Sequence, residues 1–399
     1  MKYVIILPDG AADEPLEELD GRTPLDAARI PQMDSVARQG RLGRVVTIPA
    51  GFTPGTDVGT MTLFGYDPQQ YYSGRAPIEA AARGLTAGPD EIIFRCNFVT
   101  IRDGRMRDFT AGHITQDEAD RLIADLNGLV RGGDPLLDGC RFHSGVSYRN
   151  LMIASRTVGM ELICAPPHDI PDEPVADHGP RGAGQERVRA IMHRAADLLR
   201  DHEVNRARAA LGKPPVTDIW LWGQGRPKRL QRFAERFGVR GAVITGVDVL
   251  RGLAVMMGMD RIEVPGATGY LDTNYAGKGA AAVGALGKYD LVVVHVEAPD
   301  EAGHLGDAGE KVRALERIDE LIVGPLLETL RGHGEYRILV APDHPTPCRT
   351  TAHDATPPPF CFAGTGVATE GRPFTEQAAL AGGLLIDPGH RLISEVIST

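Results

Sequence analysis

The chain has 399 residues, which suffices for two domains or for one domain that carries a large insertion. Its apolar content of 42% allows a packed core, and its formal charge of −10 argues against a nucleic-acid or anionic-membrane partner. Five widely spaced cysteines favour free thiols in a reducing cytoplasm over a disulfide framework, and no apolar stretch is long enough to span a bilayer.

Apolar runs that predict buried strands alternate with segments of helical periodicity along the whole chain. In chain order, the predicted elements are a strand at Tyr3–Leu7, helices at Ile30–Arg38, Asp117–Leu129 and Glu186–Arg200, a strand at Ile219–Trp222, a helix at Lys228–Phe237, strands at Gly241–Thr245 and Asp290–Val296, a helix at Glu310–Leu330 and a strand at Tyr336–Val340. Residues 166–184 are rich in Pro, Gly, Asp and His and predict a loop. This alternation is typical of an α/β fold with a mostly parallel central sheet.

Three of the predicted strands finish in the same dipeptide, proline followed by aspartate. The pairs are Pro8-Asp9, Pro299-Asp300 and Pro342-Asp343. Ligands of open α/β sheets bind beyond the carboxyl ends of the strands, so we expect these three carboxylates at one edge of the sheet. Because carboxylates that meet in one place repel each other, we also expect cations between them.

Histidines accompany two of these aspartates. His304 lies four residues after Asp300, so the two side chains share a face of one helical turn. His344 directly follows Asp343, and His353 comes a short loop later. A lone aspartate here would more often cap a helix, and a lone histidine would more often be an ordinary hydrogen-bonding residue. The combination instead predicts a metal site, and mixed carboxylate and imidazole ligands suit zinc or manganese, commonly as a pair of ions.

A candidate nucleophile precedes a short helical pattern that runs through Phe64. Thr56, within the segment Gly51–Thr60, is expected at the start of that helix, where unpaired backbone N–H groups favour an anion. A hydroxyl in this place can ligate a metal, lose its proton and attack phosphorus. The alternative is that Thr56 only caps the helix after a Pro54-Gly55 turn. Opposite a two-metal site, we favour the nucleophile.

Six segments together resemble the archaeal-type branch of cofactor-independent phosphoglycerate mutase. They are Pro8–Gly10, Pro54–Val58, Leu63–Pro68, Gly74–Ala80, His295–His304 and Pro342–Pro347. These motifs extend from the first predicted strand nearly to the C-terminus. The resemblance implies an alkaline phosphatase-like α/β core with two divalent ions, usually manganese, zinc or magnesium.

The resemblance also implies a ligand set and an activity. Asp300, His304 and His353 would hold one metal, and the other metal would have as its ligands Asp9, Thr56, Asp343 and His344. Thr56 would take the phosphoryl group from one carbon of glycerate and return it to the other, which interconverts 3-phosphoglycerate and 2-phosphoglycerate without a bisphosphoglycerate cofactor.

A second domain would bind the substrate. The resemblance implies a core of residues 1–66 and 289–399 and an inserted cap of residues 67–288 that keeps water from the phosphoenzyme. Candidate cations for the substrate carboxylate and phosphate are Arg75, Arg149 and Lys278, for each of which a solvated surface position is an almost equal alternative.

Two other functions remain open at this point. The family usually has serine where this chain has Thr56, and hydrolytic relatives also use threonine, so the first alternative is a two-metal phosphatase or phosphonate hydrolase. The second alternative is a non-catalytic metal- or metabolite-binding protein, against which the complete ligand set argues.

Overall fold

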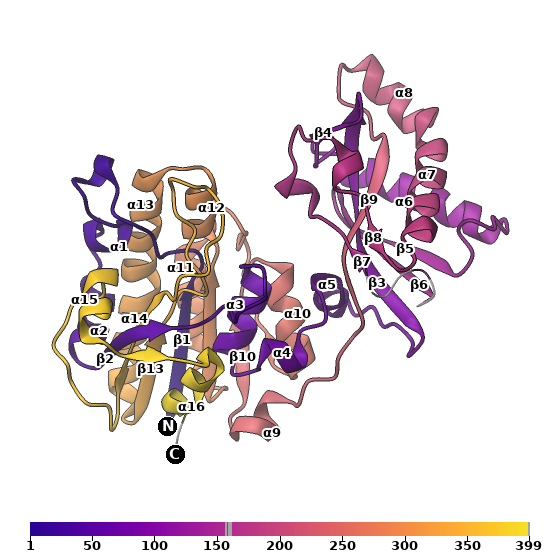
Figure 1. The fold of residues 1–399 in the computed structure, drawn as a ribbon. Coiled ribbons are helices and arrows are strands. Elements are labelled where there is room, and N and C mark those ends of the chain that lie inside the picture. Colours follow the sequence, from indigo (N-terminus) through magenta and orange to yellow (C-terminus); the bar gives the residue numbers. More distant parts are fainter. Residues whose placement is uncertain (156–157, 159–161, 398–399) are drawn as a thin grey trace. The chain divides into compact units, whose positions relative to one another are not determined.

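The computed structural model describes residues 1–155, 158 and 162–397, and it divides into two compact units (Figure 1). Unit 1 consists of Met1–Tyr72 and Arg229–Thr399, and unit 2 consists of Ser73–Lys228. No helix among the described residues is long and apolar enough to cross a membrane.

Unit 1 is built on a mostly parallel sheet, which confirms the predicted α/β class. The described strands lie in the order β11-β10-β12-β1-β13-β14-β2-β15. Their bounds are β1 Lys2–Pro8, β2 Arg41–Val45, β10 Gly241–Ile244, β11 Asp260–Arg261, β12 Leu291–Val296, β13 Tyr336–Val340, β14 Pro359–Gly364 and β15 Leu385–Ile386. Only β14, among these strands, runs antiparallel to its neighbours.

Helices cover this sheet and bury its apolar strands. Their bounds are α1 Pro24–Ala27, α2 Pro31–Arg38, α3 Thr56–Leu63, α4 Pro68–Tyr71, α9 Phe233–Phe237, α10 Asp248–Met257, α11 Tyr275–Ala285, α12 Ala298–His304, α13 Ala308–Ile318, α14 Gly324–His333, α15 Glu376–Gly382 and α16 Leu392–Ile397. Val4 and Ile6 of β1 enter the same core cluster as Leu286, Leu315 and Leu326, which lie on or next to α11, α13 and α14. The strands are therefore continuous apolar runs because protein covers them.

Two predicted helices differ from the structure. The segment Glu310–Leu330 is interrupted by a π-helical turn at Asp319–Val323, because Pro325 has no N–H for the preceding turn. The segment Lys228–Phe237 is helical only at α9, since the chain passes from unit 2 to unit 1 between Lys228 and Arg229.

Unit 2 contains a five-stranded antiparallel sheet packed against helices, and a separate two-stranded sheet of β7 and β8. Its strands are β3 Glu91–Arg102, β4 Arg105–Asp108, β5 Cys140–Val146, β6 Arg149–Ser155, β7 Leu162–Ile163, β8 Arg181–Gly182 and β9 Asp218–Gly225, and its helices are α5 Arg75–Ala82, α6 Gln116–Arg131, α7 Gln185–Arg200 and α8 Glu203–Ala210. β3 pairs with β4, β6 and β9. Phe94 and Phe98 of β3 pack with Leu122 of α6 and Ile191 of α7 in a core that belongs to this unit.

The division of the chain differs from the expected core and cap boundaries. Residues 229–288 were expected in the cap, but they lie in unit 1 because β10 pairs with β12 and α11 packs into the same core. Residues 67–72 also belong to unit 1. The insertion in the structure is therefore shorter than expected at both ends.

Candidate metal centre

The three predicted aspartates gather at one edge of the unit 1 sheet. β1 lies between β12 and β13, and all three strands are parallel, so their carboxyl ends meet. The register pairs Ile6 of β1 with Val340 of β13, and Asp9 and Asp343 each lie three residues further along the chain. Asp300 follows β12 on α12. All three carboxylates are buried.

Asp300 belongs to a helix and does not end a strand as expected. β12 ends at Val296, and Pro299 lies in the first turn of α12, where a missing N–H is tolerated. Asp300 and His304 are one turn apart, with His304 Nε2 3.2 Å from Asp300 Oδ2. His353 Nε2 lies 3.4 Å from Asp300 Oδ1. Ligand atoms of these three residues lie within 4.8 Å of one another, close enough to share one ion.

A second group adjoins the first. His344 Nε2 lies 3.3 Å from Asp9 Oδ1 and 3.7 Å from Asp343 Oδ2. Asp9, Asp300 and His344 also offer ligand atoms within 4.8 Å of one another. Asp300 therefore takes part in both groups, whereas the sequence assigned it to one.

The three histidines present the same ring nitrogen to this centre. The Nδ1 atoms of His304, His344 and His353 lie 2.9, 3.2 and 3.3 Å from main-chain carbonyl oxygens of Thr351, Pro345 and Pro54. A carbonyl only accepts hydrogen bonds, so Nδ1 carries the proton in each neutral ring. The Nε2 lone pairs consequently face the carboxylates, which is the arrangement of metal-ligating histidines.

Buried atoms without partners fit divalent ions. Among the described residues, Asp9 Oδ1, Asp343 Oδ1 and His344 Nε2 are buried and have no hydrogen-bond partner. Burial of a polar atom without a hydrogen bond destabilises the folded protein. Carboxylate oxygen and imidazole nitrogen are atoms that zinc and manganese bind. The chemistry of the donor set therefore fits a divalent metal centre.

Protonation in the absence of an ion follows from the same crowding. Burial, and after it the charge of Asp343, raises the pKa of Asp9 well above its usual value. Burial acts in the same direction on Asp300, but hydrogen bonds from His304 and His353 outweigh it and hold the pKa of Asp300 well below its usual value. Burial would lower the pKa of His304, but the hydrogen bond to Asp300 outweighs burial and raises this pKa to about 9. Without an ion, protons on Asp9 and His304 thus reduce the repulsion between the carboxylates, which bound cations would also do.

Thr56 begins α3 beside the loops that carry these residues. Gly55 is the N-cap residue, so Thr56 is the first helical residue, and its side chain is buried. One turn later, Thr60 Oγ1 donates to Asp343 Oδ2 at 3.3 Å. A Cβ on Gly59 would lie 2.4 Å from the carbonyl oxygen of Asp343, so only glycine permits this approach. The helix start therefore lies against the Asp343 loop.

Several residues of the centre escaped the sequence reasoning. His295 Nε2 lies 2.7 Å from Asp9 Oδ2, and Thr346 Oγ1 donates to Asp300 Oδ1 at 2.5 Å. The Tyr72 hydroxyl donates to Asp57 Oδ2 at 2.6 Å, next to Thr56. His295 and Thr346 belong to two of the six segments that resemble the family, but nothing in their spacing distinguished them from ordinary strand or loop residues.

Comparison with known proteins identifies the family. A protein of Methanothrix thermoacetophila named 2,3-bisphosphoglycerate-independent phosphoglycerate mutase is 49% identical over the full length of both chains. The family profile of that name matches residues 37–205. The chain belongs to this phosphoglycerate mutase family.

Two solved structures agree with this assignment. A cofactor-independent phosphoglycerate mutase from Thermoplasma acidophilum has a TM-score of 0.63 at 28% identity, with 100% of this chain and 99% of that chain covered. A protein from Pyrococcus horikoshii has a TM-score of 0.80 at 28% identity, with 99% and 96% covered. The resemblance drawn from the six motifs is thereby confirmed for the phosphoglycerate mutase family.

One of the predicted substrate cations of this family member, Arg75, contacts a buried carboxylate in unit 2, and another, Arg149, influences its pKa. Arg75 Nε donates to Glu79 Oε1 at 3.2 Å, and Arg95 Nε lies 3.1 Å from Glu79 Oε2. Arg149 stacks over the ring of Tyr148 at 5.1 Å. Burial would raise the pKa of Glu79, but Arg95, Arg75 and Arg149 lower it. Two guanidinium groups thus contact one carboxylate, on which the charge of Arg149 also acts, and the sequence reasoning missed Arg95.

Lys278 has a different surrounding from the one expected. The side chain is buried on α11 in unit 1, and Nζ donates to the carbonyl oxygen of His295 at 3.0 Å. Burial lowers the pKa of Lys278 to about 8. Its ammonium group therefore holds the end of β12, and we do not retain Lys278 among the proposed substrate contacts.

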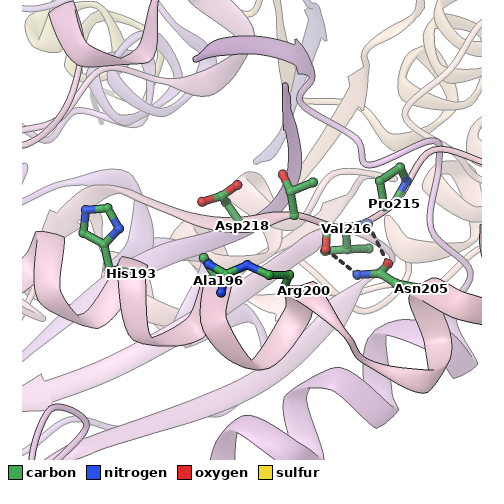
Figure 2. Close-up of a pocket in the computed structure, with 8 residues that line it drawn as sticks. His193, Ala196, Arg200, Asn205, Pro215, Val216 and Asp218 are labelled. Atoms are coloured by element: carbon green, nitrogen blue, oxygen red, sulfur yellow. Dashed lines mark hydrogen bonds between the residues drawn. The ribbon is translucent and has the colours of Figure 1, made fainter. Parts of the chain in front are cut away.

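Unit 2 also contains a hollow unrelated to the predicted residues. Figure 2 shows His193 and Arg200 of α7 on one side and Asp218 at the start of β9 on the other. Its volume is about 370 Å³. Burial raises the pKa of Asp218. None of the predicted site residues lines this hollow, so it has no part in the metal centre.

Proposed function

We propose that this chain interconverts 3-phosphoglycerate and 2-phosphoglycerate at a centre of two divalent ions, through a phosphothreonine at Thr56. The observation that supports the proposal is the buried cluster of carboxylates and inward-facing Nε2 atoms beside the start of α3. The family relatives carry the name of this activity, which extends the proposal to the substrate.

The proposed ligands are those implied by the sequence. Asp300, His304 and His353 hold one ion, and the second ion has the ligands Asp9, Thr56, Asp343 and His344. Manganese, zinc and magnesium are the candidate metals. When bound, the ions neutralise the charge of the phosphate oxygens and favour loss of the threonine proton.

Thr56 performs the covalent step in this proposal. Its Oγ1 forms a bond to phosphorus while the bond from phosphorus to the glycerate oxygen breaks, and that oxygen leaves as a hydroxyl once it is protonated. The other hydroxyl of the glycerate then attacks phosphothreonine, which returns Thr56 to its starting state. The positive end of the α3 dipole, at the start of the helix, favours the phosphate charge throughout.

Unit 2 is the proposed substrate-binding domain. Arg75 and Arg149, together with Arg95, contact the anionic groups of the phosphoglycerate. Arg75, Arg95 and Arg149 all lower the pKa of Glu79, so their positive charges lie close enough together to suit a carboxylate or phosphate oxygen of the substrate. We further propose that the protein works in a reducing cytoplasm, as its five free cysteines suggest.

Phosphorus NMR tests the activity directly. Protein loaded with Mn²⁺ is incubated with 3-phosphoglycerate and no bisphosphoglycerate, and the spectrum is followed over time. We expect the signal of 2-phosphoglycerate to grow to an equilibrium ratio. Release of inorganic phosphate without 2-phosphoglycerate would support the hydrolase alternative, which the threonine at position 56 favours. A spectrum unchanged with metal would reject both enzymes.

A further inference from the structure

One buried histidine beside the metal centre is absent from the proposed ligand set. His295 is the penultimate residue of β12, and its side chain is fully buried. The ring spans two elements of the sheet. Nε2 lies 2.7 Å from Oδ2 of Asp9, and Nδ1 lies 3.0 Å from Oγ1 of Thr245, directly after β10. Other positions of β12 carry valine or leucine, which would fill this space without buried polar atoms.

The hydrogen-bond network around His295 determines which nitrogen carries the proton. Nε2 faces two carboxylates, Asp9 at 2.7 Å and Glu297 Oε2 at 3.4 Å. The Thr245 hydroxyl already accepts the N–H of Val247 at 3.0 Å, and among the described residues it has no acceptor for its own proton except His295 Nδ1. Thr245, His295 and Asp9 are all paired when Thr245 donates to Nδ1 and Nε2–H donates to Asp9, whereas Glu297 Oε2 has no hydrogen-bond partner among the described residues.

This arrangement is the reverse of that in the three ligand histidines. Each of those rings directs Nδ1–H to a carbonyl and turns Nε2 toward the carboxylates, as described above. Asp9, His295 and Glu297 also offer atoms within 4.8 Å of one another, but in this arrangement His295 presents an N–H to Asp9 and therefore acts as a donor. The bond occupies Oδ2 of Asp9 and leaves Oδ1 directed at His344, 3.3 Å away, with no other partner among the described residues.

The main chain of His295 is held as firmly as its ring. Lys278 Nζ donates to the carbonyl oxygen of His295 at 3.0 Å, from the buried face of α11. β12 pairs with β1 up to the register of Pro8 with Val296, immediately before Asp9. The donor nitrogen is therefore fixed relative to the carboxylate that it binds.

We propose that His295 is a positioning residue that orients Asp9 toward its ion, with Thr245 fixing the ring of His295. This inference rests on the proposed function, because it takes Asp9 as a metal ligand. Second-layer donors of this kind hold a carboxylate in one rotamer, and they lower the cost of ordering it when the ion binds. Mutation of such partners typically costs metal affinity.

Mn²⁺ titration of the full chain tests the role, by calorimetry and by electron paramagnetic resonance of free Mn²⁺. His295→Leu should weaken one Mn²⁺ site on the order of 10- to 100-fold without changing the stoichiometry. His295→Gln, which can place an N–H near the Nε2 position, should stay within about threefold of the unmodified protein. Thr245→Val should weaken binding less than His295→Leu, and it should add nothing in the His295→Leu background.

A second buried histidine serves as a matched control. His202 in unit 2 makes a similar contact, with Nε2 2.8 Å from Asp125 Oδ2, and it contacts none of the proposed ligands among the described residues. His202→Leu should therefore leave Mn²⁺ affinity unchanged. Thermal unfolding of each metal-free variant separates loss of fold from loss of affinity.

The possible outcomes distinguish this inference from the proposed function. If the unmodified protein binds no Mn²⁺, the proposed two-metal function fails and the inference falls with it. If the unmodified protein binds Mn²⁺ and folded His295→Leu binds it equally well, only the role of His295 is overturned. Loss of one equivalent of Mn²⁺ in His295→Gln would also overturn it, because His295 would then be a ligand.

Discussion

At the scale of single residues, neighbouring main-chain groups decide what each histidine can do. Carbonyl oxygens beside His304, His344 and His353 place a proton on Nδ1 and leave Nε2 available for a metal. The Thr245 hydroxyl has the opposite effect on His295. Histidines of the same chemistry thus carry the proton on Nδ1 or on Nε2 according to a single contact.

Removal of the Thr56 hydroxyl tests the covalent step. Thr56→Val keeps the shape of the side chain, and we expect the rate of 2-phosphoglycerate formation to fall on the order of 10³-fold or more, since nucleophile removal has effects at least this large. Thr56→Ser should retain activity because it keeps the hydroxyl. Initial rates measured with saturating Mn²⁺ check both variants. A Thr56→Val variant with nearly unchanged turnover would exclude phosphothreonine.

Metal affinity should depend on pH through His304. Asp300 raises the pKa of His304 to about 9, so below this pH the imidazole carries a proton that an ion must displace. The Mn²⁺ association constant should therefore rise with pH, by about tenfold per unit for each displaced proton. Titrations between about pH 6.5 and pH 8.5 measure the slope. His304→Gln should bind more weakly with a shallower slope, and a slope unaffected by this change would contradict the assignment.

At the scale of secondary-structure elements, α3, whose first residue is Thr56, closely approaches the Asp343 loop. Gly59 allows the helix backbone to touch the carbonyl of Asp343, and Thr60 binds its carboxylate. The buried Lys311 of α13 joins two other segments, since Nζ binds Asp13 Oδ2 and the Thr346 carbonyl oxygen, both at 2.8 Å. Loops that carry ligands are thus fixed by neighbouring helices.

Substitution of Gly59 tests the contact between helix and loop. A methyl group at Gly59 would lie 2.4 Å from a backbone oxygen, so Gly59→Ala must move α3. We expect a loss of about 1–3 kcal/mol in the free energy of unfolding, together with a lower mutase rate. Gly284→Ala in α11 is the matched control. That site is open, and the change should stabilise the protein by about 0.4–1 kcal/mol.

Urea unfolding and the phosphorus NMR rate give the two readouts for these variants. The interpretation requires Gly59→Ala to lose activity more than Gly284→Ala. Equal activities of Gly59→Ala and Gly284→Ala would show that α3 can shift without disturbing Thr56.

At the scale of the whole molecule, every proposed metal ligand belongs to unit 1, while the arginine cluster belongs to unit 2. The ends of unit 2 meet, because Ser73 Oγ donates to the carbonyl of Arg226 at 2.5 Å. Each unit also has its own apolar core. The molecule therefore separates metal binding from the proposed recognition of the substrate.

Deletion of unit 2 tests this separation. A chain in which Tyr72 is joined to Arg229 by a short flexible linker should fold and bind Mn²⁺ within about threefold of the full chain, since it keeps all ligands. It should form no 2-phosphoglycerate, because the arginine cluster is gone. Calorimetric titration and phosphorus NMR measure the two properties. If the deleted chain folds but loses Mn²⁺ affinity, unit 2 contributes to the metal centre.

The sequence alone predicted the fold class, the family and the edge of the sheet at which the aspartates gather. These features depend on local patterns, namely apolar runs, Pro-Asp pairs after predicted strands and the six sequence segments that resemble the family. The compact units of the structure end at other residues than the expected core and cap, because residues 229–288 have no local mark that distinguishes a core strand from a cap strand. The pairing of β10 with β12 is what assigns residues 229–288 to unit 1.

The tertiary structure decided which ring nitrogen faces the centre, that Lys278 is buried under β12, and that His295 binds Asp9. Each of these facts is a contact between segments far apart in the sequence, and its chemistry depends on distances that spacing along a chain does not contain. Residue types therefore limited the possible functions, whereas packing assigned a role to each side chain.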